Sequence, residues 1–440
     1  MNKKVFIETY GCQMNQADSE IVAAVLKDNS YRVVDEIDKA DIIFVNTCSI
    51  RDNAEQKVKN RLIELEAFKR ENPELRIGVL GCMAERMKEE LFEENKSVDM
   101  VIGPDAYRDI PNLLAQVESG QKVANVLLSE EETYSEIEPI RLASNGVSAF
   151  ISIMRGCENF CSYCVVPFTR GKERSRDYKT IIAEAQDLFE KGYREVTLLG
   201  QNVNSYLWEE DGKKINFAVL IDMVAKVSPL LRIRFSTSHP KDISEELVDA
   251  MLNNNNICRS LHLPVQSGST RMLKKMNRKY TREDYLSKVD MVKEKIPEIS
   301  LSTDIIAGFC SESIEDHEDT LSIMKYVGYD YAFMFNYSER PGTIAQRNFE
   351  DDVPKEEKSR RLSEIIDLQR ELSLASNTKD IGKEFEVLVE GVSKRSDKEY
   401  FGRTSQNKVV IFNKKGAEIG DYINVRINDC TSATLFGEIL

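Results

Sequence analysis

Apolar and polar positions follow a regular order over the first 125 residues of the chain. Each short apolar run is followed by a longer stretch whose apolar residues recur at helical spacing. We expect strands over 3–12, 40–48, 75–82 and 98–105, and helices over 19–28, 53–71, 84–94 and 109–118. Strands that alternate with helices predict a parallel sheet covered by helices on both faces.

A second alternation of strands and helices begins near residue 148. The expected strands cover 149–157, 194–201, 232–240, 259–266, 300–309 and 331–339, and the expected helices 178–191, 216–228, 243–255, 282–295 and 315–327. Six such units predict an incomplete (β/α)6 barrel. Ligands of a barrel of this kind bind at the C-terminal ends of its strands.

The tail has a different pattern. A charged amphipathic helix is expected over 355–377, and short strands over 385–394, 399–405, 408–412, 422–430 and 433–440 predict a small antiparallel β-barrel. Between the two alternating regions, glutamates and a proline predict a solvated acidic linker over 126–146. The fold class is therefore α/β, with a parallel-sheet domain at 1–125, a barrel domain at 147–375 and a small β-barrel domain at 376–440.

Composition adds a class and a compartment. With 41% hydrophobic and 30% charged residues, the 440-residue chain is typical of a soluble globular protein. No apolar run reaches the roughly 18 residues of a membrane span, and the N-terminal residues have no signal-peptide pattern. We therefore expect a cytoplasmic protein without a membrane partner. The net charge of −14 does not exclude nucleic acid, because screening over about 8 Å lets a local basic patch dominate.

Nine cysteines favour metal chemistry over a disulfide framework, because their number is odd and the chain has no export signal. Cys157, Cys161 and Cys164 are spaced C-x3-C-x2-C directly after the first expected barrel strand. A structural zinc site takes four ligands, and a [4Fe–4S] cluster usually takes four thiolates. Three cysteines leave one iron open. This spacing is typical of radical S-adenosylmethionine (SAM) enzymes, in which SAM chelates that iron.

A second triplet is spread along the chain. Cys12, Cys48 and Cys82 each follow one of the first three expected strands. Because the C-terminal ends of parallel strands share one edge of a sheet, we expect these sulfurs to converge as a second three-ligand metal site. The alternative is that they pack as small hydrophobic residues. That alternative is our interpretation of the remaining cysteines, Cys258, Cys310 and Cys430.

The motifs that surround these cysteines resemble those of the radical SAM methylthiotransferase family, most closely its tRNA-modifying members. They are TYGCQMNQADSE (9–20), VNTCSIRDNAEQK (45–57), GCMAER (81–86), RGCENFCSYCVVPFTRGKERSR (155–176), LLGQNVNSY (198–206), HLPVQSGS (262–269) and FNYSERPGTIA (335–345). The resemblance spans the whole chain, and the last domain is similar to a TRAM domain, which binds RNA.

The resemblance implies two [4Fe–4S] clusters, one on Cys157, Cys161 and Cys164 that cleaves SAM, and an auxiliary one on Cys12, Cys48 and Cys82 that carries sulfur. Two SAM molecules would be used per turnover. The implied reaction converts N6-isopentenyladenosine at position 37, beside the tRNA anticodon, to its 2-methylthio derivative. We expect no catalytic side chain, because general acid–base catalysis contributes only about 10²- to 10⁴-fold and would not cleave this C–H bond. The cofactors carry the chemistry.

The resemblance also indicates where SAM binds. Gly200 and Gln201 follow the second barrel strand, where the superfamily has a glycine-rich contact, although this chain has GQN instead of GGE. Ile306, Gly308 and Glu312 lie near the superfamily's adenine contact. Cys310 and Ser311 stand there where many radical SAM proteins have Pro-Gly. Ordinary strand-end turns are the alternative for both segments.

Two segments are expected to bind RNA. The run 165–176 carries Arg170, Lys172, Arg174 and Arg176 against one glutamate, and it could hold phosphate near the radical. The C-terminal domain groups basic and aromatic residues at Lys394, Arg395, Lys398, Tyr400, Phe401 and Arg403. Small β-barrels use such groups for phosphate attraction and base stacking. A solvated charged loop and a generic polar face are the respective alternatives.

The expected partners are the anticodon stem–loop of an isopentenylated tRNA, an electron donor and a sulfur source, and we expect a monomer. Two rival functions lie within the family: methylthiolation of an aspartate of ribosomal protein S12, and methylthiolation of threonylcarbamoyl-adenosine in tRNA. A rival from another class is a non-catalytic RNA-binding protein that is stabilised by zinc. That protein would need four ligands per site, whereas each triplet offers three.

Overall fold

The computed structural model describes residues 3–49, 52–142 and 144–440. Ile50 and Arg51, within the motif at 45–57, and Ala143, within the expected linker, lie outside the described residues. The chain forms two compact units. The first unit comprises Met1–Ala143, Ser152–Phe160 and Cys164–Thr180, and the second comprises Ser144–Ile151, Cys161–Tyr163 and Ile181–Leu440.

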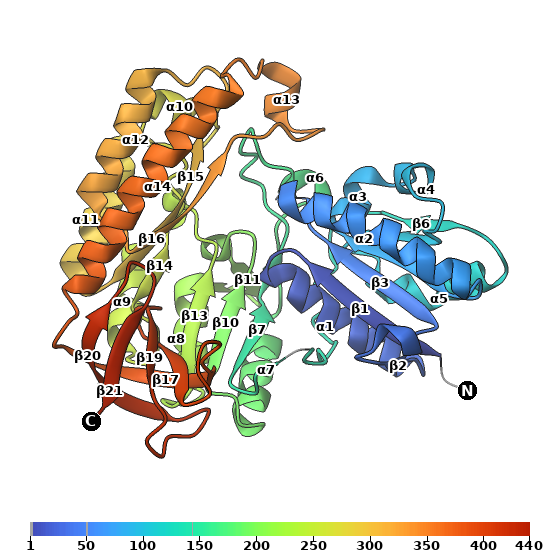
Figure 1. Ribbon diagram of the computed structural model, residues 1–440, viewed down its shortest axis with the longest axis horizontal. Coiled ribbons are helices and arrows are strands. Elements are labelled where there is room, and N and C mark those ends of the chain that lie inside the picture. The colour runs from blue at the N-terminus through green and yellow to red at the C-terminus, as the bar shows by residue number, and fades with distance from the viewer. Residues whose placement is uncertain (1–2, 50–51, 143) are drawn as a thin grey trace. The chain divides into compact units, whose positions relative to one another are not determined.

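The first unit is built on the predicted parallel sheet (Figure 1, blue to cyan). The strands lie in the order β2 (Arg32–Val33), β1 (Lys4–Tyr10), β3 (Ile42–Thr47), β4 (Arg76–Gly81), β5 (Met100–Ile102) and β6 (Val123–Asn125). All neighbouring pairs are parallel. The short edge strands β2 and β6 were not predicted, because two or three residues carry no measurable alternation.

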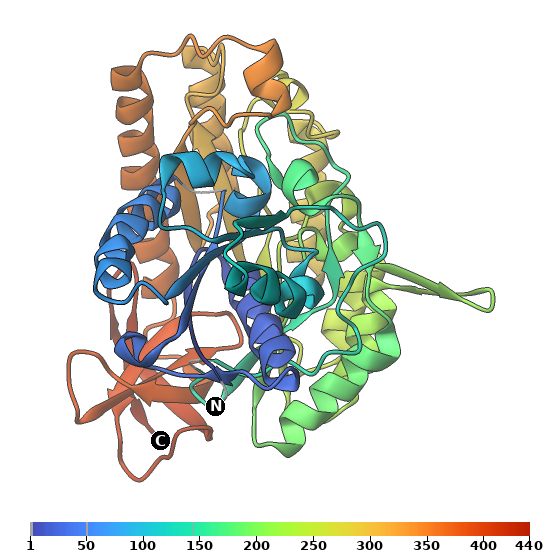
Figure 2. The same cartoon turned by 90° about the vertical axis from the view of Figure 1, so that its right-hand side faces the viewer.

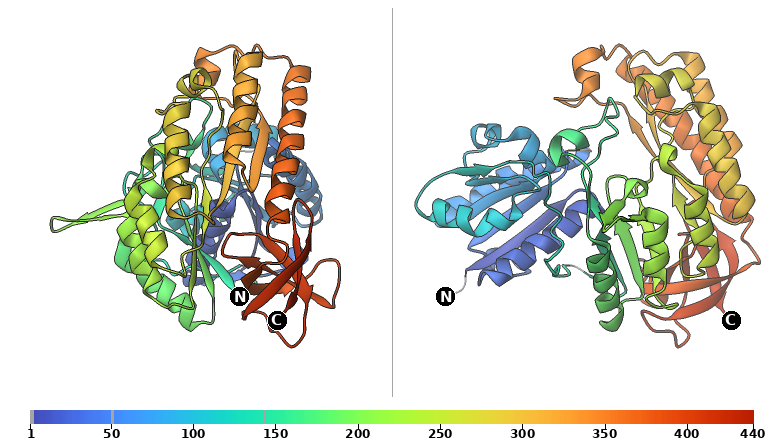
Figure 3. Two further views of the ribbon diagram at one scale, coloured as in Figure 1. Left: turned by 90° about the vertical axis from the view of Figure 1, so that its left-hand side faces the viewer. Right: turned by 180° about the vertical axis from the view of Figure 1, so that it is seen from behind.

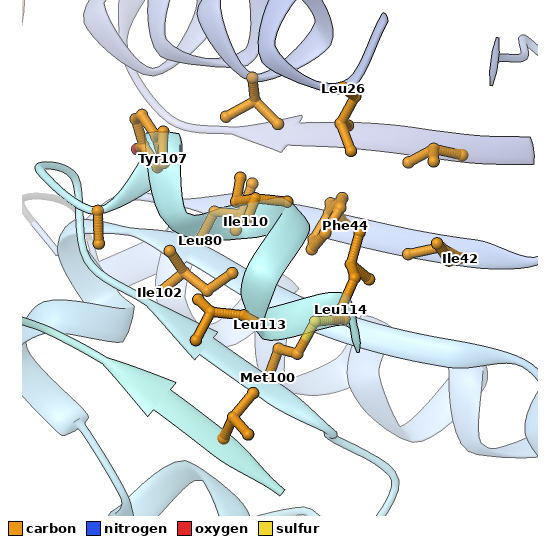
Figure 4. Packing of buried hydrophobic residues seen from close by; sticks show 14 of the residues in the cluster. Leu26, Ile42, Phe44, Leu80, Met100, Ile102, Tyr107, Ile110, Leu113 and Leu114 are labelled. Atoms are coloured by element: carbon orange, nitrogen blue, oxygen red, sulfur yellow. The ribbon is translucent and has the colours of Figure 1, made fainter. Parts of the chain in front are cut away.

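Helices cover both faces of this sheet, as predicted. One core cluster joins α1 (Gln13–Asp28) and α5 (Ile110–Glu118) to the sheet through residues such as Leu26, Phe44 and Leu114 (Figure 4). The other joins α2 (Asp52–Glu71), α3 (Cys82–Met87) and α4 (Glu90–Glu94) to the opposite face. The sheet is therefore a rigid base for the loops at its strand ends.

The acidic segment after β6 is packed on the first unit through one aromatic ring, although its other described residues are exposed or half-buried. Tyr134 is only 2% exposed and stacks on Tyr107 with ring centroids 5.6 Å apart. Glu132 and Glu136 both form ion pairs with Arg108. The glutamates indicated solvent, but burial of the aromatic ring outweighs them and holds the segment on the first unit.

The second unit contains the predicted incomplete barrel. Its strands lie in the order β7 (Ser148–Ser152), β10 (Glu195–Leu199), β13 (Arg232–Ser236), β14 (Ser260–His262), β15 (Ser300–Ala307) and β16 (Tyr331–Asn336). A parallel bridge between Ile233 and Ile257 joins the two halves. The helices that follow the strands are α7 (Tyr178–Glu190), α8 (Phe217–Ala225), α9 (Glu245–Asn253), α11 (Arg282–Lys295) and α12 (Ile314–Val327).

The helix α14 (Lys355–Thr378) was also predicted, and it lies beside α12 on the outside of the barrel (Figure 3). Near its start, Arg361 donates to the carboxylate of Glu312 in the loop after β15. Near its end, the Asn377 amide donates to the Thr431 carbonyl of the C-terminal domain. The helix thus connects the C-terminal ends of the barrel strands to the tail.

The tail closes into the predicted small barrel, in the order β17 (Glu384–Val392), β18 (Glu399–Thr404), β19 (Val409–Asn413), β21 (Leu435–Ile439) and β20 (Tyr422–Cys430). An unpredicted hairpin, β11 (Leu207–Glu210) and β12 (Lys213–Asn216), projects from the second unit (Figure 2). Further short elements are α6 (Val166–Arg170), β8 (Met154–Arg155), β9 (Arg174–Ser175), α10 (Thr270–Lys275) and α13 (Ile344–Asn348). Among the described helices, none is both long and apolar enough to span a bilayer.

Candidate functional site

The three cysteines of the first unit lie at the level ends of three neighbouring strands. Strands β1, β3 and β4 end together, because Tyr10 is in register with Thr47 and Thr47 with Gly81. Cys48 follows β3 directly, Cys12 caps the start of α1, and Cys82 begins α3. The expected convergence therefore has a structural basis in the register of the sheet.

Close packing at these ends requires glycine before two of the cysteines. A Cβ atom at Gly11 would lie 2.8 Å from the Cβ atom of Cys48. Gly81 has a φ of +89°, and a Cβ atom there would lie 2.7 Å from the Thr47 carbonyl oxygen. Side chains at these two positions would push the strand ends apart.

A buried amide fixes the first of these cysteines. The Oδ1 atom of Asn15 accepts from the backbone N–H of Cys12 and lies 3.3 Å from its Sγ, while the Asn15 amide donates to the Thr47 carbonyl. A hydrogen bond from Cys48, together with the charge of Arg170, lowers the pKa of Cys12 to about 6 against the effect of burial. Cys12 is thereby prepared to act as a thiolate ligand.

Arg170 is the cation closest to this site. Its Nε donates to Cys82 Sγ at 3.2 Å, and its Nη2 forms an ion pair with Asp18 at 2.6 Å. Arg155 binds the other oxygen of Asp18, and Arg174 binds Asp105 at 3.0 Å. This buried network contains three guanidinium groups against two carboxylates, and Arg170 Nη1 has no hydrogen-bond partner.

The structure therefore assigns different surroundings to the basic run at 165–176 than the sequence indicated. Arg170, Arg174 and Arg176 are buried and bonded to protein groups, with Arg176 donating to Thr180 and to the Ser152 carbonyl. Of the four basic residues in the run, only Lys172 is exposed, and its ion pair with Glu130 lies at the surface. The burial speaks against phosphate contact for the three arginines, because such a contact needs a solvent-facing guanidinium.

This surplus of buried positive charge fits an anionic cluster on three thiolates. Burial of an unpaired charge is costly unless a counter-charge is supplied. Among the described residues, no three His, Cys, Asp or Glu side chains group as ligands of one metal ion. A four-iron cluster distributes its thiolates over different irons, so its ligands need only border a common space.

The second triplet lies in the loop between β8 and α6. Cys161 is buried, and Cys157 and Cys164 are partly buried. Gly156 precedes the loop with a φ of +80°, and a Cβ atom there would lie 1.8 Å from the Lys172 carbonyl oxygen. The amide of Asn159 donates to Cys157 Sγ at 3.4 Å. Glycine is therefore required before this triplet too.

Arg278 contacts Cys161 of the second triplet and was not predicted from the sequence. Its Nη1 donates to Cys161 Sγ at 3.3 Å and lies 3.4 Å from the Tyr163 hydroxyl. Its remaining donors reach the Pro264 carbonyl and the Tyr280 hydroxyl. No local spacing could have revealed this arginine, because it lies 117 residues from Cys161.

Several buried polar atoms without hydrogen-bond partners lie at or after the C-terminal ends of barrel strands in the second unit. Gln201 Oε1 follows β10, Ser238 Oγ and His239 Nε2 follow β13, and Asn336 Oδ1 ends β16. Of these residues only Gln201 was predicted. The others could have been found from the polar residues that follow the strands in STSHP and FNY. Such atoms fit a polar ligand at this end of the barrel.

The loop after β15 is closed by its own side chains. Gly308 has a φ of +71°, and its N–H donates to Glu312 Oε2 at 2.5 Å. The same oxygen accepts from Arg361, so the carboxylate of Glu312 holds the loop in shape. Ile306 packs on a small apolar cluster with Phe309 and Tyr163, and Gly200 is buried beside Gln201.

One face of the barrel sheet remains accessible. Asp304 is in register with Phe333, and Ile306 with Phe335, so these side chains share a face. Phe333 and Phe335 are 44% and 39% exposed, and His262 contacts the Phe333 ring edge to face at 5.8 Å. The residues between them, such as Ile305 and Ala307, are buried. Exposed aromatic rings on a barrel strand offer a stacking surface.

The small C-terminal barrel divides the residues predicted to bind RNA. Lys394, Arg395 and Lys398 are exposed, and the ammonium group of Lys414 lies 4.7 Å from the Tyr400 ring centroid. Phe401 packs against Gly391. Arg403 instead donates to Glu195 at 2.7 Å and to Glu390 at 2.6 Å, which fixes the small barrel on the larger one.

Three family models match the chain. They are UPF0004, described as an uncharacterized protein family, over residues 4–103, the radical SAM superfamily over 151–324 and the TRAM domain over 379–440. Among solved structures, the radical SAM methyltransferase TsrM of Kitasatospora setae has a TM-score of 0.57 at 14% identity and covers 79% of this chain and 74% of its own. The enzyme OxsB has a TM-score of 0.55 at 15% identity, with 84% and 56% covered. These structures share the fold.

Curated relatives match over nearly their whole length. Proteins named tRNA-2-methylthio-N(6)-dimethylallyladenosine synthase from Parabacteroides distasonis and Phocaeicola vulgatus are each 57% identical to this chain. The alignments cover 99% of this chain and 95% and 96% of the respective relatives. The chain belongs to the family of these synthases, which are radical SAM methylthiotransferases.

Proposed function

We propose that this protein is a tRNA methylthiotransferase that converts N6-isopentenyladenosine at position 37, beside the anticodon, to its 2-methylthio derivative. The observation that carries the proposal is the level arrangement of Cys12, Cys48 and Cys82 at three strand ends, in a chain that also has a radical SAM domain. Full-length relatives named for this reaction support the choice of substrate.

The two cysteine triplets would hold the two [4Fe–4S] clusters. When bound, the cofactors would supply a deoxyadenosyl radical from SAM at Cys157, Cys161 and Cys164, and sulfur and a methyl group at Cys12, Cys48 and Cys82. The chain contributes ligands, orientation and exclusion of water. A barrel interior that excludes water protects a radical from side reactions.

The polar atoms after the barrel strands would orient SAM. Burial and the charge of Arg278 lower the pKa of His239 to about 2, so its ring is neutral at physiological pH. Its Nδ1 accepts from the Lys241 N–H, which leaves Nε2 as a donor without a partner. We assign Nε2 to the SAM carboxylate or ribose, and we expect Gln201 and Asn336 to contribute to the same pocket. Gly200, Ile306 and Gly308 would complete the pocket, and Glu312 would maintain its loop.

The accessible barrel face would receive the adenine base. Phe333 and Phe335 offer rings for the purine and its apolar N6 substituent. His262 and Asp304 lie on the same face, with His262 Nε2 3.5 Å from the Asp304 carboxylate. They would meet the polar edge of the base. Such a face would bind the isopentenylated base more tightly than the unmodified one, because binding buries the apolar surface of the isopentenyl group.

The tRNA backbone would contact exposed basic residues. Lys394, Arg395 and Lys398 in the small barrel, with Tyr400 and Phe401 as aromatic neighbours, form the main surface, and Lys172 is the exposed cation of the run at 165–176. Each lysine or arginine that neutralises a phosphate makes binding more dependent on salt. Because Arg403 is held by Glu195 and Glu390, we expect it to act through the fold.

The decisive experiment is anaerobic turnover with anticodon stem–loops that carry or lack the isopentenyl group, scored by nucleoside mass. We expect the 2-methylthio product only from the isopentenylated RNA, and protein with about eight irons per chain, four per cluster. A parallel reaction with ribosomal protein S12 tests the rival substrate. Product on S12 alone, or a colourless zinc protein that turns over neither substrate, would reject the proposal.

A further inference from the structure

We infer that each cysteine triplet has its own buried arginine, which donates to one sulfur and raises the reduction potential of the cluster held there. Arg170 serves the triplet of Cys82, and Arg278 serves the triplet of Cys161. The inference rests on the proposed function for the presence of the clusters. It adds two positioning residues that act through the ligands.

Arg170 has the geometry of a donor to the cluster. Its Nε–H points to Cys82 Sγ at 3.2 Å, and its Nη2 is anchored by Asp18 at 2.6 Å. Asp18 is shared with Arg155, so the carboxylate cannot neutralise both cations. The third nitrogen, Nη1, is buried and has no partner. The guanidinium therefore has one donor on a thiol, and a second buried donor that could bond to a bound cluster.

Arg278 is also a buried arginine that donates to a cysteine sulfur, but its other partners differ from those of Arg170. It is buried, and its hydrogen-bond partners are one thiol, two tyrosine hydroxyls and one carbonyl. No carboxylate among the described residues pairs with it. Arginine stays protonated in proteins, so the protein buries this charge without a carboxylate counter-ion. A thiolate at Cys161 supplies the missing negative charge.

The effect on potential follows from electrostatics. A 2+ cubane core on three thiolates is already anionic, and one-electron reduction adds a further negative charge. A fixed cation at hydrogen-bond distance from a ligand sulfur stabilises the reduced state more than the oxidised state, and weak screening in the interior strengthens the effect. Hydrogen bonds to the sulfurs are known to set cluster potentials.

A structural role alone does not account for both arginines. An arginine that serves only to fix the fold would be expected to end on carboxylates and carbonyls with its buried donors satisfied. Arg174 has this pattern: it binds both oxygens of Asp105 and three carbonyls, and it contacts no sulfur. Arg174 is therefore the matched control within the same buried network.

The test separates the clusters by mutation in the full chain. A variant with Cys157, Cys161 and Cys164 replaced by Ala retains only the site of Cys82, and a variant with Cys12, Cys48 and Cys82 replaced retains only the site of Cys161. Into each we would introduce R170Q, R278Q or R174Q and titrate the cluster anaerobically, with the reduced signal followed by electron paramagnetic resonance. The potential reports on the cluster without any turnover.

We expect R170Q and R278Q each to shift the potential of its own cluster and to leave the potential of the other cluster unchanged. At the parental midpoint, R170Q lowers the ratio of reduced to oxidised cluster about tenfold at the Cys82 site only, equivalent to about 59 mV for one electron. R278Q has this effect at the Cys161 site only, and R174Q at neither. R170K and R278K should shift the potential less than the Gln variants do, because lysine keeps the positive charge.

Several results would overturn the inference. They are an absent shift, an equal shift with R174Q, or a shift at the wrong site. Loss of iron in the Gln variant but not in the Lys variant supports the inference, because charge is then what retains the cluster. Loss in both overturns it. A parental triple variant with no [4Fe–4S] signal would instead refute the proposed function, so the two failures are distinguishable.

Discussion

Replacement of Glu195 by Gln should destabilise the contact between the small C-terminal barrel and the larger barrel. Glu195 is completely buried in β10, and its carboxylate binds Arg234 at 2.8 Å and Arg403 at 2.7 Å. The substitution keeps the shape of the side chain but leaves Arg234 without its counter-charge, while Arg403 keeps only Glu390. Removal of one partner from a buried ion pair costs about 3–5 kcal/mol.

The assay is thermal unfolding of the apoprotein followed by circular dichroism. A loss of about 3–5 kcal/mol should lower Tm by at least roughly 6 °C, since about 1 kcal/mol shifts Tm by about 2–4 °C in large domains. The matched control is E130Q, which breaks the exposed pair of Glu130 with Lys172 and should leave Tm unchanged. Equal melting of the two variants would refute our description of Glu195 as the buried anchor.

The same carboxylate should make the stability of the parent protein depend on pH. Burial alone would raise the pKa of Glu195, but the charges of Arg234 and Arg403 lower it below its ordinary value of 4.5. A depressed folded-state pKa adds stability that is present above pH 4.5 and is lost as the pH falls through the folded-state pKa. The difference in Tm between parent and E195Q should therefore shrink as the pH falls below 4.5.

Three further predictions concern chemistry and RNA. Cys161→Ala should abolish SAM cleavage, whereas Cys48→Ala should still cleave SAM but make no methylthio product, as chromatography of both products would show. Phe333→Ala should lower kcat/KM for the isopentenylated stem–loop about tenfold, because a lost stacking contact costs about 1–3 kcal/mol. Arg395→Ala with Lys398→Ala should weaken tRNA binding and reduce its salt slope by about one per lost phosphate contact.

Each of these predictions has a control variant of similar chemical type. Cys258→Ala, which removes a buried cysteine outside both triplets, should keep both activities. Leu207→Ala removes an exposed apolar side chain from the hairpin and should leave kcat/KM intact. Lys226→Ala, at an exposed ion pair with Asp222, should not alter tRNA binding. If a control matched its test variant, the corresponding role would be wrong.

Elements with strong periodicity could be predicted from the sequence, and weak or mixed ones could not. The six barrel strands and α14 were found because apolar runs and helical spacing extend over enough residues to be distinctive. The hairpin β11–β12 was missed because half of LWEEDGKKIN is charged, and only the pair of Trp208 and Ile215 gives it a buried side. The burial of Tyr134 was not predicted, because the glutamates around it indicate solvent.

For the site, sequence spacing indicated ligands but not their electrostatic surroundings. The six cysteines could be proposed because loop spacing and strand order are local properties. Arg170 was identified as a cation and assigned to RNA, because a sequence shows charge without showing burial. Arg278 was missed because only the tertiary fold brings it to Cys161. Partners that come from distant segments need coordinates.

The length of helix α14 fixes the distance between the small C-terminal barrel and the strand ends of the larger barrel. Its 24 residues span about 36 Å at 1.5 Å per residue, with Arg361 tied near one end and Asn377 near the other. An unbroken helix is stiff over this length, so its two attachments cannot drift independently. For the proposed function, the helix sets a fixed distance between the small barrel, which would hold the tRNA, and the barrel strand ends, where the base would be modified.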